Sequence, residues 1–223
     1  MSFLRTGPWC LVLLLGLVPA LASAADKQAV LEFAMAVDAQ GHPTDVRAPE
    51  GLPPSIGESV QAWARDLRFV PATVDGVAQP STTTLYLTFS VGDDGTSQIV
   101  NASTGPGLVR GRTGEPPVHD GAGYVRIEYD GTGKVIDAHF EHQAAHNVDR
   151  SFWRWAESFA KNTTIVPETV GGAPVAGTAR IPLLYCRQRC PPLPPLPTDS
   201  GTTLGDRLVA ESLLRPATGN GTP

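Results

Sequence analysis

The chain has 223 residues and a formal net charge of −5, from 17 basic and 22 acidic side chains. This balance excludes a strongly basic nucleic-acid-binding protein, and 41% hydrophobic against 17% charged residues excludes a charge-rich disordered chain. The 23 glycines and 21 prolines favour short strands and turns over a helical bundle.

The first segment, residues 1–24, has the pattern of a secretory signal peptide. Arg5 supplies the positive charge, residues 9–21 are mostly apolar, and residues 22–24 (Ala-Ser-Ala) form a small-residue cleavage site. The apolar run is shorter than the roughly 17 to 25 residues that a spanning helix needs. We therefore expect cleavage after Ala24, a periplasmic mature chain and no stable membrane span.

A first module is expected over residues 25–100. Its opening strand alternates in polarity and ends at the turn Asp38-Ala39-Gln40-Gly41, and a second strand over residues 44–48 completes a hairpin. Apolar residues at helical spacing then predict an amphipathic helix, with Ser55 and Glu58 as its capping box. The stripe of this helix consists of Ile56, Val60, Trp63 and Leu67.

The first module is expected to end with an extended segment and a third strand. The string Phe69-Val70-Pro71-Ala72 leaves the helix, Asp75-Gly76 forms a turn, and Leu85 to Val91 alternate in polarity. The order of elements is therefore β-β-α-β, with one helix on a small antiparallel sheet.

A second module over residues 122–190 repeats this order. A strand from Tyr124 ends at the turn Asp130-Gly131-Thr132-Gly133, a second strand covers residues 134–140, and Asn147 is the expected N-cap of a helix. The helix stripe is offset from the first stripe by a constant number of residues: Val148, Phe152, Trp155 and Phe159. The string Ile165-Val166-Pro167-Glu168 and a last strand, Ile181 to Tyr185, complete the module.

Two segments lie outside the modules. Residues 101–121 are rich in Gly, Pro and Thr, which predicts a linker, and residues 191–223 are expected to form a flexible Pro-rich tail. The tail opens with Pro191-Pro192-Leu193-Pro194-Pro195-Leu196-Pro197, a composition typical of polyproline II. Such a run serves as a stiff spacer or binds an aromatic groove, and the sequence leaves both open.

These patterns together predict an α+β protein of two β-β-α-β modules, each a small antiparallel sheet with one packed helix. One helix on three strands makes a thin core, which favours mutual support between the modules.

The order of motifs resembles the TonB C-terminal domain family. In the first module the resemblance lies in the turn at residues 37–41, the helix exit from Trp63 to Ala72, and the turn Asp75-Gly76. The second module is a weaker copy, with Glu168 in place of Ala72. The resemblance implies a periplasmic protein that binds a short peptide from an outer-membrane receptor by adding it to a sheet edge. Every motif residue has a structural role, so none points to catalysis.

The chain departs from the energy-transducing members of that family in three ways. It has a cleavable leader instead of an anchor, it has no long Pro-rich spacer before its first strand, and it carries two copies in tandem. We therefore expect a non-catalytic binding protein without a cofactor, which captures an extended segment of another envelope protein such as an outer-membrane receptor. A homodimer is left open.

The expected binding edges are the last strands of the two modules, Leu85 to Val91 and Ile181 to Tyr185. Alternation places Tyr86, Thr88 and Ser90 on the outward side of the first of these strands. The sequence also allows these edges to be covered by the other module or paired in a dimer.

Cleavage of the leader leaves two cysteines, Cys186 and Cys190. In an oxidising compartment two thiols at this spacing favour a structural disulfide that pins the end of the last strand. The spacing is C-x3-C, which differs from the C-x-x-C of thiol oxidoreductases.

Three histidines, His139, His142 and His146, lie in one stretch and are the candidates for a metal site, with Glu141 beside them. On a strand, however, His139 and His142 face opposite sides of the sheet. A polar strand end followed by a loop is therefore the favoured interpretation.

Three other functions stay open. A TonB-type energy transducer, or its accessory in outer-membrane transport, requires the leader to be retained as an anchor. A metal-dependent enzyme would use the stretch from His139 to His146. An inhibitor or immunity factor against an envelope-directed toxin is neither supported nor excluded.

Overall fold

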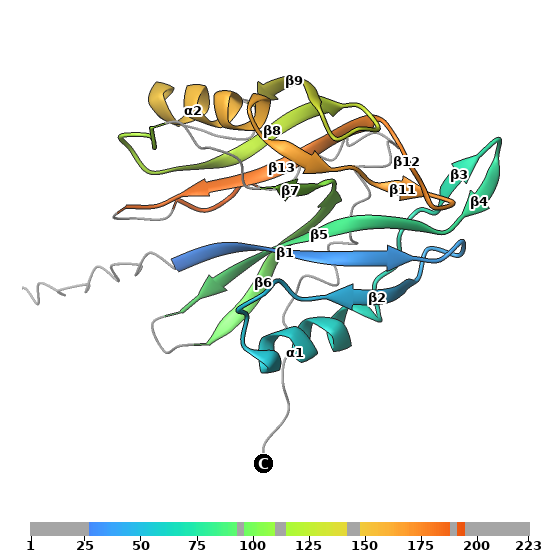
Figure 1. Ribbon diagram of the computed structural model, residues 1–223. Coiled ribbons are helices and arrows are strands. Elements are labelled where there is room, and N and C mark those ends of the chain that lie inside the picture. Colours follow the sequence, from blue (N-terminus) through green and yellow to red (C-terminus); the bar gives the residue numbers. More distant parts are fainter. Residues whose placement is uncertain (1–26, 93–95, 110–114, 142–147, 188–190, 195–223) are drawn as a thin grey trace, which may run out of the picture.

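The chain has an α+β fold, described by a computed structural model for residues 27–92, 96–109, 115–141, 148–187 and 191–194 (Figure 1). These residues form two helices and mostly antiparallel strands in several small sheets, and each helix packs against strands of a sheet. The predicted fold class is therefore confirmed. The predicted leader lies outside the described residues, and within them no helix is long and apolar enough to cross a membrane.

The first module has β1 at the centre of its sheet. β1 pairs antiparallel with β2 on one side and with β5 on the other, and alternate residues of β1 and β5 face α1. Phe33, Met35, Leu85 and Leu87 are buried in the core on that side. The bounds of its elements are β1 Lys27–Val37, β2 Pro43–Arg47, α1 Pro54–Ala64, β3 Ala72–Val74, β4 Val77–Gln79 and β5 Ser81–Val91.

The second module has the same order of elements, with one additional short strand, β10, after its helix. β8 pairs antiparallel with β9 on one side and β13 on the other, as β1 does with β2 and β5. Its core contains Val125, Ile127, Phe140 and Phe152, and the rings of Phe140 and Phe152 meet edge to face at 5.8 Å. The bounds are β8 Gly121–Tyr129, β9 Val135–Phe140, α2 Arg150–Lys161, β10 Thr164–Val166, β11 Thr169–Val170, β12 Ala173–Pro174 and β13 Gly177–Tyr185.

The repeat extends to single hydrogen bonds at the first turn of each module. The Phe69 backbone N–H donates to the Gly41 carbonyl at 2.9 Å, and the Ile165 N–H donates to the Gly133 carbonyl at 3.1 Å. Both glycines have positive φ, +84° and +85°. In each module the turn after the first strand is therefore tied to the residues that follow the helix.

An aspartate closes each of these turns. The carboxylate of Asp38 accepts from the backbone N–H of Gln40 and His42, both at 2.8 Å. Asp130 accepts in the same way from the Thr132 and Lys134 N–H groups. These bonds lower the pKa of both aspartates, chiefly through the His42 N–H for Asp38 and the Thr132 hydroxyl for Asp130.

The predicted helix caps were wrong. α1 starts at Pro54 after the N-cap Pro53, with no side-chain cap, so Ser55 and Glu58 do not form a capping box. Proline is favoured at the first helical position because its missing N–H would be unpaired there, and the helix therefore starts two residues earlier than a cap at Ser55 predicts. The N-cap of α2 is Asp149, which accepts from the Ser151 N–H at 2.7 Å, and not Asn147.

The predicted linker was wrong over its first half. β6, Ser97–Gly105, forms a hairpin with β5, and β7, Gly107–Val109, pairs with β10 of the second module. At least one of the small residues that suggested a loop lies in a tight contact, because a Cβ atom on Gly105 would lie 3.3 Å from the Ala179 side chain.

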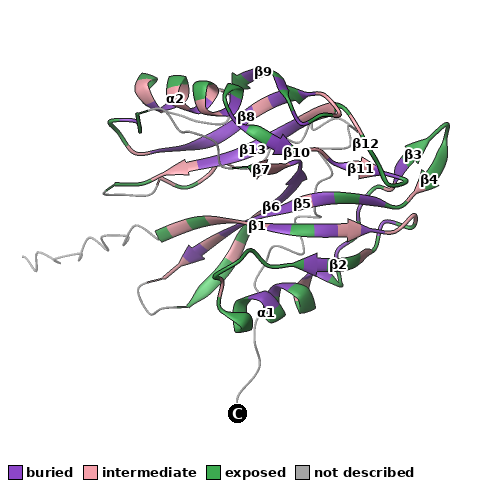
Figure 2. Cartoon of the chain, in the orientation of Figure 1, coloured by how far each residue is buried: buried purple, intermediate pink, exposed green. Residues whose placement is uncertain are grey.

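The two modules pack together through the side of the first sheet that faces away from α1. The helices lie on opposite outer sides of the molecule, with strands of both modules between them (Figure 1), and buried residues are concentrated in these strands (Figure 2). Tyr86 of β5 belongs to the core cluster of the second module. β11 extends the first sheet, because Thr169 and Val170 pair with the first two residues of β5.

Candidate functional site

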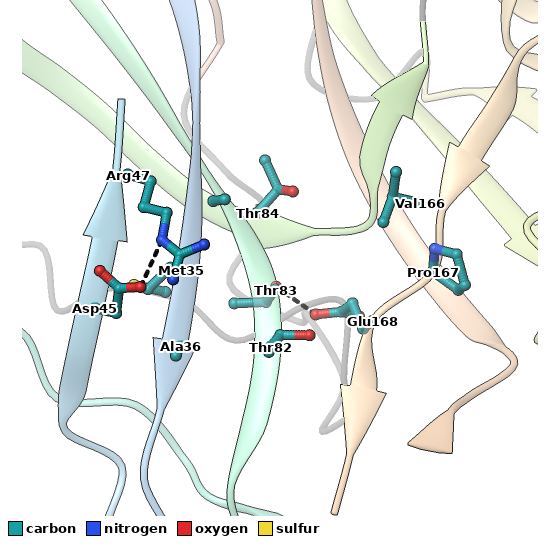
Figure 3. A pocket seen from close by; sticks show the side chains of 11 residues that line it. Met35, Ala36, Asp45, Arg47, Thr82, Thr83, Thr84, Val166, Pro167 and Glu168 are labelled. Carbon is teal, nitrogen blue, oxygen red and sulfur yellow. Dashed lines mark hydrogen bonds and ion pairs between the residues drawn. The ribbon is translucent and has the colours of Figure 1, made fainter. Parts of the chain in front are cut away.

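A groove of about 210 Å³ opens between the two modules, as the close view in Figure 3 shows. Its floor is the face of the first sheet opposite α1, where β1 and β5 run side by side. β2 forms one wall, and the segment between β10 and β11 forms the other. The lining residues are Ala34, Met35, Ala36, Asp45, Arg47, Thr82, Thr83, Thr84, Val166, Pro167 and Glu168.

The β2 wall of the groove carries an exposed ion pair. Arg47 Nε lies 2.7 Å from Asp45 Oδ2, with 78% and 47% of the two side chains exposed. Ion pairs this exposed contribute on the order of 1 kcal/mol or less to stability. Both charges can therefore turn to a bound partner at little cost to the fold.

A buried carboxylate lies at the base of the opposite wall. Glu168 is 1% exposed, and it accepts hydrogen bonds from the hydroxyls of Thr83 and, at 2.8 Å, Tyr129. Thr83 belongs to the first module and Tyr129 to the second. A second bond joins the Thr82 and Thr169 hydroxyls at 2.7 Å. Glu168 therefore connects the modules directly below the groove.

The prediction that Leu85 to Val91 form an open edge was wrong. β5 is paired along both sides, with β1 and with β6, so Tyr86, Thr88 and Ser90 lie in a central strand. All three residues are at most 3% exposed, and Tyr86 packs into the core of the second module. Tyr86 donates a hydrogen bond to the Pro106 carbonyl.

Burial also fixes the state of the Tyr86 hydroxyl. The pKa of Tyr86 is raised well above its ordinary value by loss of solvent, and the carboxylates of Glu32 and Glu168 raise it further. This phenol therefore acts as a neutral hydrogen-bond donor inside the protein.

The second predicted edge, Ile181 to Tyr185, belongs to β13. Among the described strands β13 pairs with β8 alone, so it is an edge strand of its own sheet. It lies against β6 and β1 of the first module, and both Ile181 and Leu183 are buried. The side chains of β13 are therefore packed within the chain, and the prediction that its edge binds a partner stays a prediction.

The outer strands β2 and β9 are each protected by a helix side chain. Gln61 of α1 donates to the Val46 carbonyl of β2 at 2.9 Å, and Glu157 of α2 accepts from the Phe140 N–H of β9 at 2.9 Å. These bonds occupy backbone groups that an added strand would need.

Comparison with known proteins does not decide between these surfaces. No protein-family model matches the chain, and neither the curated proteins nor the solved structures contain a significant match to it. The resemblance to the TonB C-terminal domain therefore stays a prediction.

The histidine stretch is placed only in part. His139 lies on β9 with its side chain 73% exposed, and its Nε2 is 2.7 Å from Asp137 Oδ2. His142 and His146 lie outside the described residues. Within the described ranges, no group of three or more His, Cys, Asp or Glu side chains is arranged to hold a metal ion.

The predicted disulfide also stays a prediction. Cys186 follows β13 directly and is exposed, whereas Cys190 lies outside the described residues. The chain next to Cys186 is anchored, because the Arg187 N–H donates to the Asp120 carboxylate.

The sequence carries one signal that points to Glu168 as a buried polar residue. Glu168 occupies the repeat position of Ala72, and both side chains are buried. A carboxylate at a position that is apolar in the other copy needs hydrogen-bond partners inside the protein. That mismatch within the repeat indicates a buried polar contact.

Proposed function

We propose that this chain is a non-catalytic binding protein of the cell envelope, which holds an extended segment of a partner protein in the groove between its modules. The observation that carries the proposal is the groove itself, whose floor is a β-sheet face with small side chains. The envelope location rests on the secretory leader predicted from residues 1–24.

The floor of the groove suits a partner main chain. Ala34 is exposed, Ala36 and Thr84 are half-buried, and Thr82 is exposed at the first positions of β5. Side chains of this size let another backbone come close to the sheet, and the threonine hydroxyls can donate and accept hydrogen bonds. A segment that lies flat can thus find polar partners along its length.

The two walls suit different side chains of the partner. Val166 is 58% exposed and Pro167 is half-buried, so one wall offers an apolar contact. The other wall offers the charges of Arg47 and Asp45. We therefore expect a partner segment with an apolar residue next to a charged residue.

The resemblance to the TonB C-terminal domain agrees with capture of an extended segment. The mode differs from simple strand addition to the last strand, because β6 already occupies the outer side of β5. The groove is the place where the same face of the first sheet is open to a partner.

Site-specific photocrosslinking in living cells tests the proposal. A probe at Arg47 lies on the groove wall, and a control probe at Glu58 lies exposed on α1, on the other side of the sheet. We expect a discrete foreign envelope protein attached at Arg47 and absent at Glu58. Adducts confined to the chain itself, or identical patterns from both positions, would contradict the proposal.

A variant with a filled groove provides a second test of the proposal. Ala34→Trp places a large side chain on the exposed floor, and we expect it to abolish the adduct at Arg47 while the circular dichroism spectrum is unchanged. An unchanged adduct in this variant would place the partner elsewhere.

A further inference from the structure

The start of the Pro-rich tail is bound to the body of the protein by its backbone. Within residues 191–195 only Leu193 has an N–H, because the other four residues are prolines. That N–H donates to Gln28 Oε1 at 3.1 Å. The next carbonyl, of Pro194, accepts from the Tyr124 hydroxyl at 3.2 Å.

The residues that hold the tail come from three strands of both modules. Gln28 lies on β1, Tyr124 on β8 and Asn101 on β6, and the Asn101 amide donates to the Tyr124 hydroxyl. The Tyr124 side chain is fully buried, so its ring and hydroxyl are held in one position. Gln28 pairs with Ser90 across the sheet, which places the tail on the same sheet face as Thr88 and Ser90.

Proline-rich segments suit this kind of binding. They adopt the polyproline II conformation, which has no internal hydrogen bonds, so their carbonyls are free to accept from a partner. Little conformational entropy is lost when they bind, and an aromatic residue with a hydroxyl donor is a typical feature of the grooves that receive them. Leu193 and Pro194 are both half-buried here.

We propose that Gln28, Asn101 and Tyr124 form a binding surface for proline-rich segments, which the chain's own residues 191–194 occupy. A second proline-rich segment reaches this surface only when the tail is displaced, because residues 193 and 194 already occupy its hydrogen-bonding groups. The surface is separate from the groove between the modules, because Gln28 and Ala34 lie toward opposite ends of β1.

A peptide-binding measurement on the full-length chain tests this surface. The variant replaces residues 191–197 by a Gly-Ser sequence of equal length, and the probe is the labelled peptide Pro-Pro-Leu-Pro-Pro-Leu-Pro, followed by fluorescence anisotropy. We expect saturable binding to the variant. Binding to the unaltered chain should be at least about tenfold weaker, because its own tail competes at an effective concentration in the millimolar range.

Matched controls separate recognition from nonspecific adhesion. A heptaproline peptide keeps the conformation but lacks the N–H that Gln28 accepts, so we expect it to bind roughly three- to tenfold more weakly. Tyr124→Phe in the Gly-Ser variant should weaken the leucine-containing peptide by a similar factor.

A single substitution gives an independent arm in case the Gly-Ser variant fails to fold. Leu193→Pro in the full-length chain removes the N–H that holds the tail, together with the half-buried leucine side chain, so we expect the peptide to bind this variant several-fold more tightly than the unaltered chain. Equal binding to both chains, or no binding to any tail variant that is folded, overturns the proposal.

Discussion

The glycines of the two repeated turns have both a conformational and a steric role. A Cβ atom at Gly41 would lie 2.0 Å from the Phe69 carbonyl oxygen, and one at Gly133 would lie 2.2 Å from the Ile165 carbonyl oxygen. In both cases the atom in the way belongs to the backbone that the glycine carbonyl itself binds. The turn and the segment after the helix therefore cannot both keep their positions around a larger residue.

Replacing these glycines should destabilise the protein more than their φ angles alone require. We expect Gly41→Ala to lower the free energy of unfolding by more than about 2 kcal/mol, from the left-handed conformation and the lost contact together. Gly51→Ala is the matched control, because Gly51 has a φ of +81° but no atom within 4 Å of the added Cβ. Its expected loss is about 1 kcal/mol. Urea unfolding measures both values, and equal losses would remove the steric part of the argument.

At the scale of elements, β11 depends on polar contacts more than on apolar area. It pairs with β5 through two residues, and Glu168 immediately before it binds the Thr83 and Tyr129 hydroxyls. Such a short strand gains little from its backbone pairing alone. The buried carboxylate therefore adds a connection from this segment to residues of both modules.

Removing the Glu168 carboxylate should loosen β11 and the groove wall together. Glu168→Ala leaves the Tyr129 hydroxyl buried without this acceptor, so we expect a loss of about 2 to 3 kcal/mol in unfolding free energy. Glu128→Ala, at an exposed position of β8, should change it by less than about 0.5 kcal/mol. Hydrogen exchange should also rise at Thr169 and Val170 in the first variant. A loss no larger than that of the control would show that Glu168 is not the connection.

The elements that sequence patterns predicted are those with local signals. The repeated turns, the two helices and the alternating strands β1 and β5 each follow from residues close together in the chain. β6 has no such signal, because its last four residues, 102–105, are small or polar and do not alternate between apolar and polar side chains. β6 is extended because it pairs with β5, and this pairing cannot be read from residues 97–105 alone.

The same limit applies to the candidate sites at the scale of the whole molecule. Alternation correctly placed Tyr86, Thr88 and Ser90 on the side of β5 away from α1, but it could not show what covers that side. The groove, the Glu168 contacts and the tail surface each combine residues of both modules. Such sites become visible only once the relative position of the modules is known.

The shared packing of the modules has a consequence for how the molecule unfolds. Tyr86 is carried by the first sheet but is buried in the core of the second module, and β11 of the second module pairs with β5. The core of the second module is therefore incomplete without Tyr86, and the sheet of the first module includes a strand of the second. We therefore expect one cooperative unfolding transition for the whole chain, as is usual when domains share a core.

Tryptophan reporters can follow the two modules separately in the mature chain expected after cleavage at Ala24. Trp63 reports on the first module, and Trp153 and Trp155 report on the second. In Trp63→Phe, and separately in the double variant that keeps only Trp63, the fluorescence midpoint in urea should coincide with the circular dichroism midpoint.

Tyr86→Ala should lower the urea midpoint of both reporters together, because we expect it to reduce the free energy of unfolding by about 3 to 5 kcal/mol. Tyr86→Phe should reduce the free energy of unfolding by only about 1 kcal/mol. If the Trp63 transition kept its midpoint in Tyr86→Ala while the Trp153 and Trp155 transition fell, the modules would be independent folding units, and the groove between them would not be a fixed binding site.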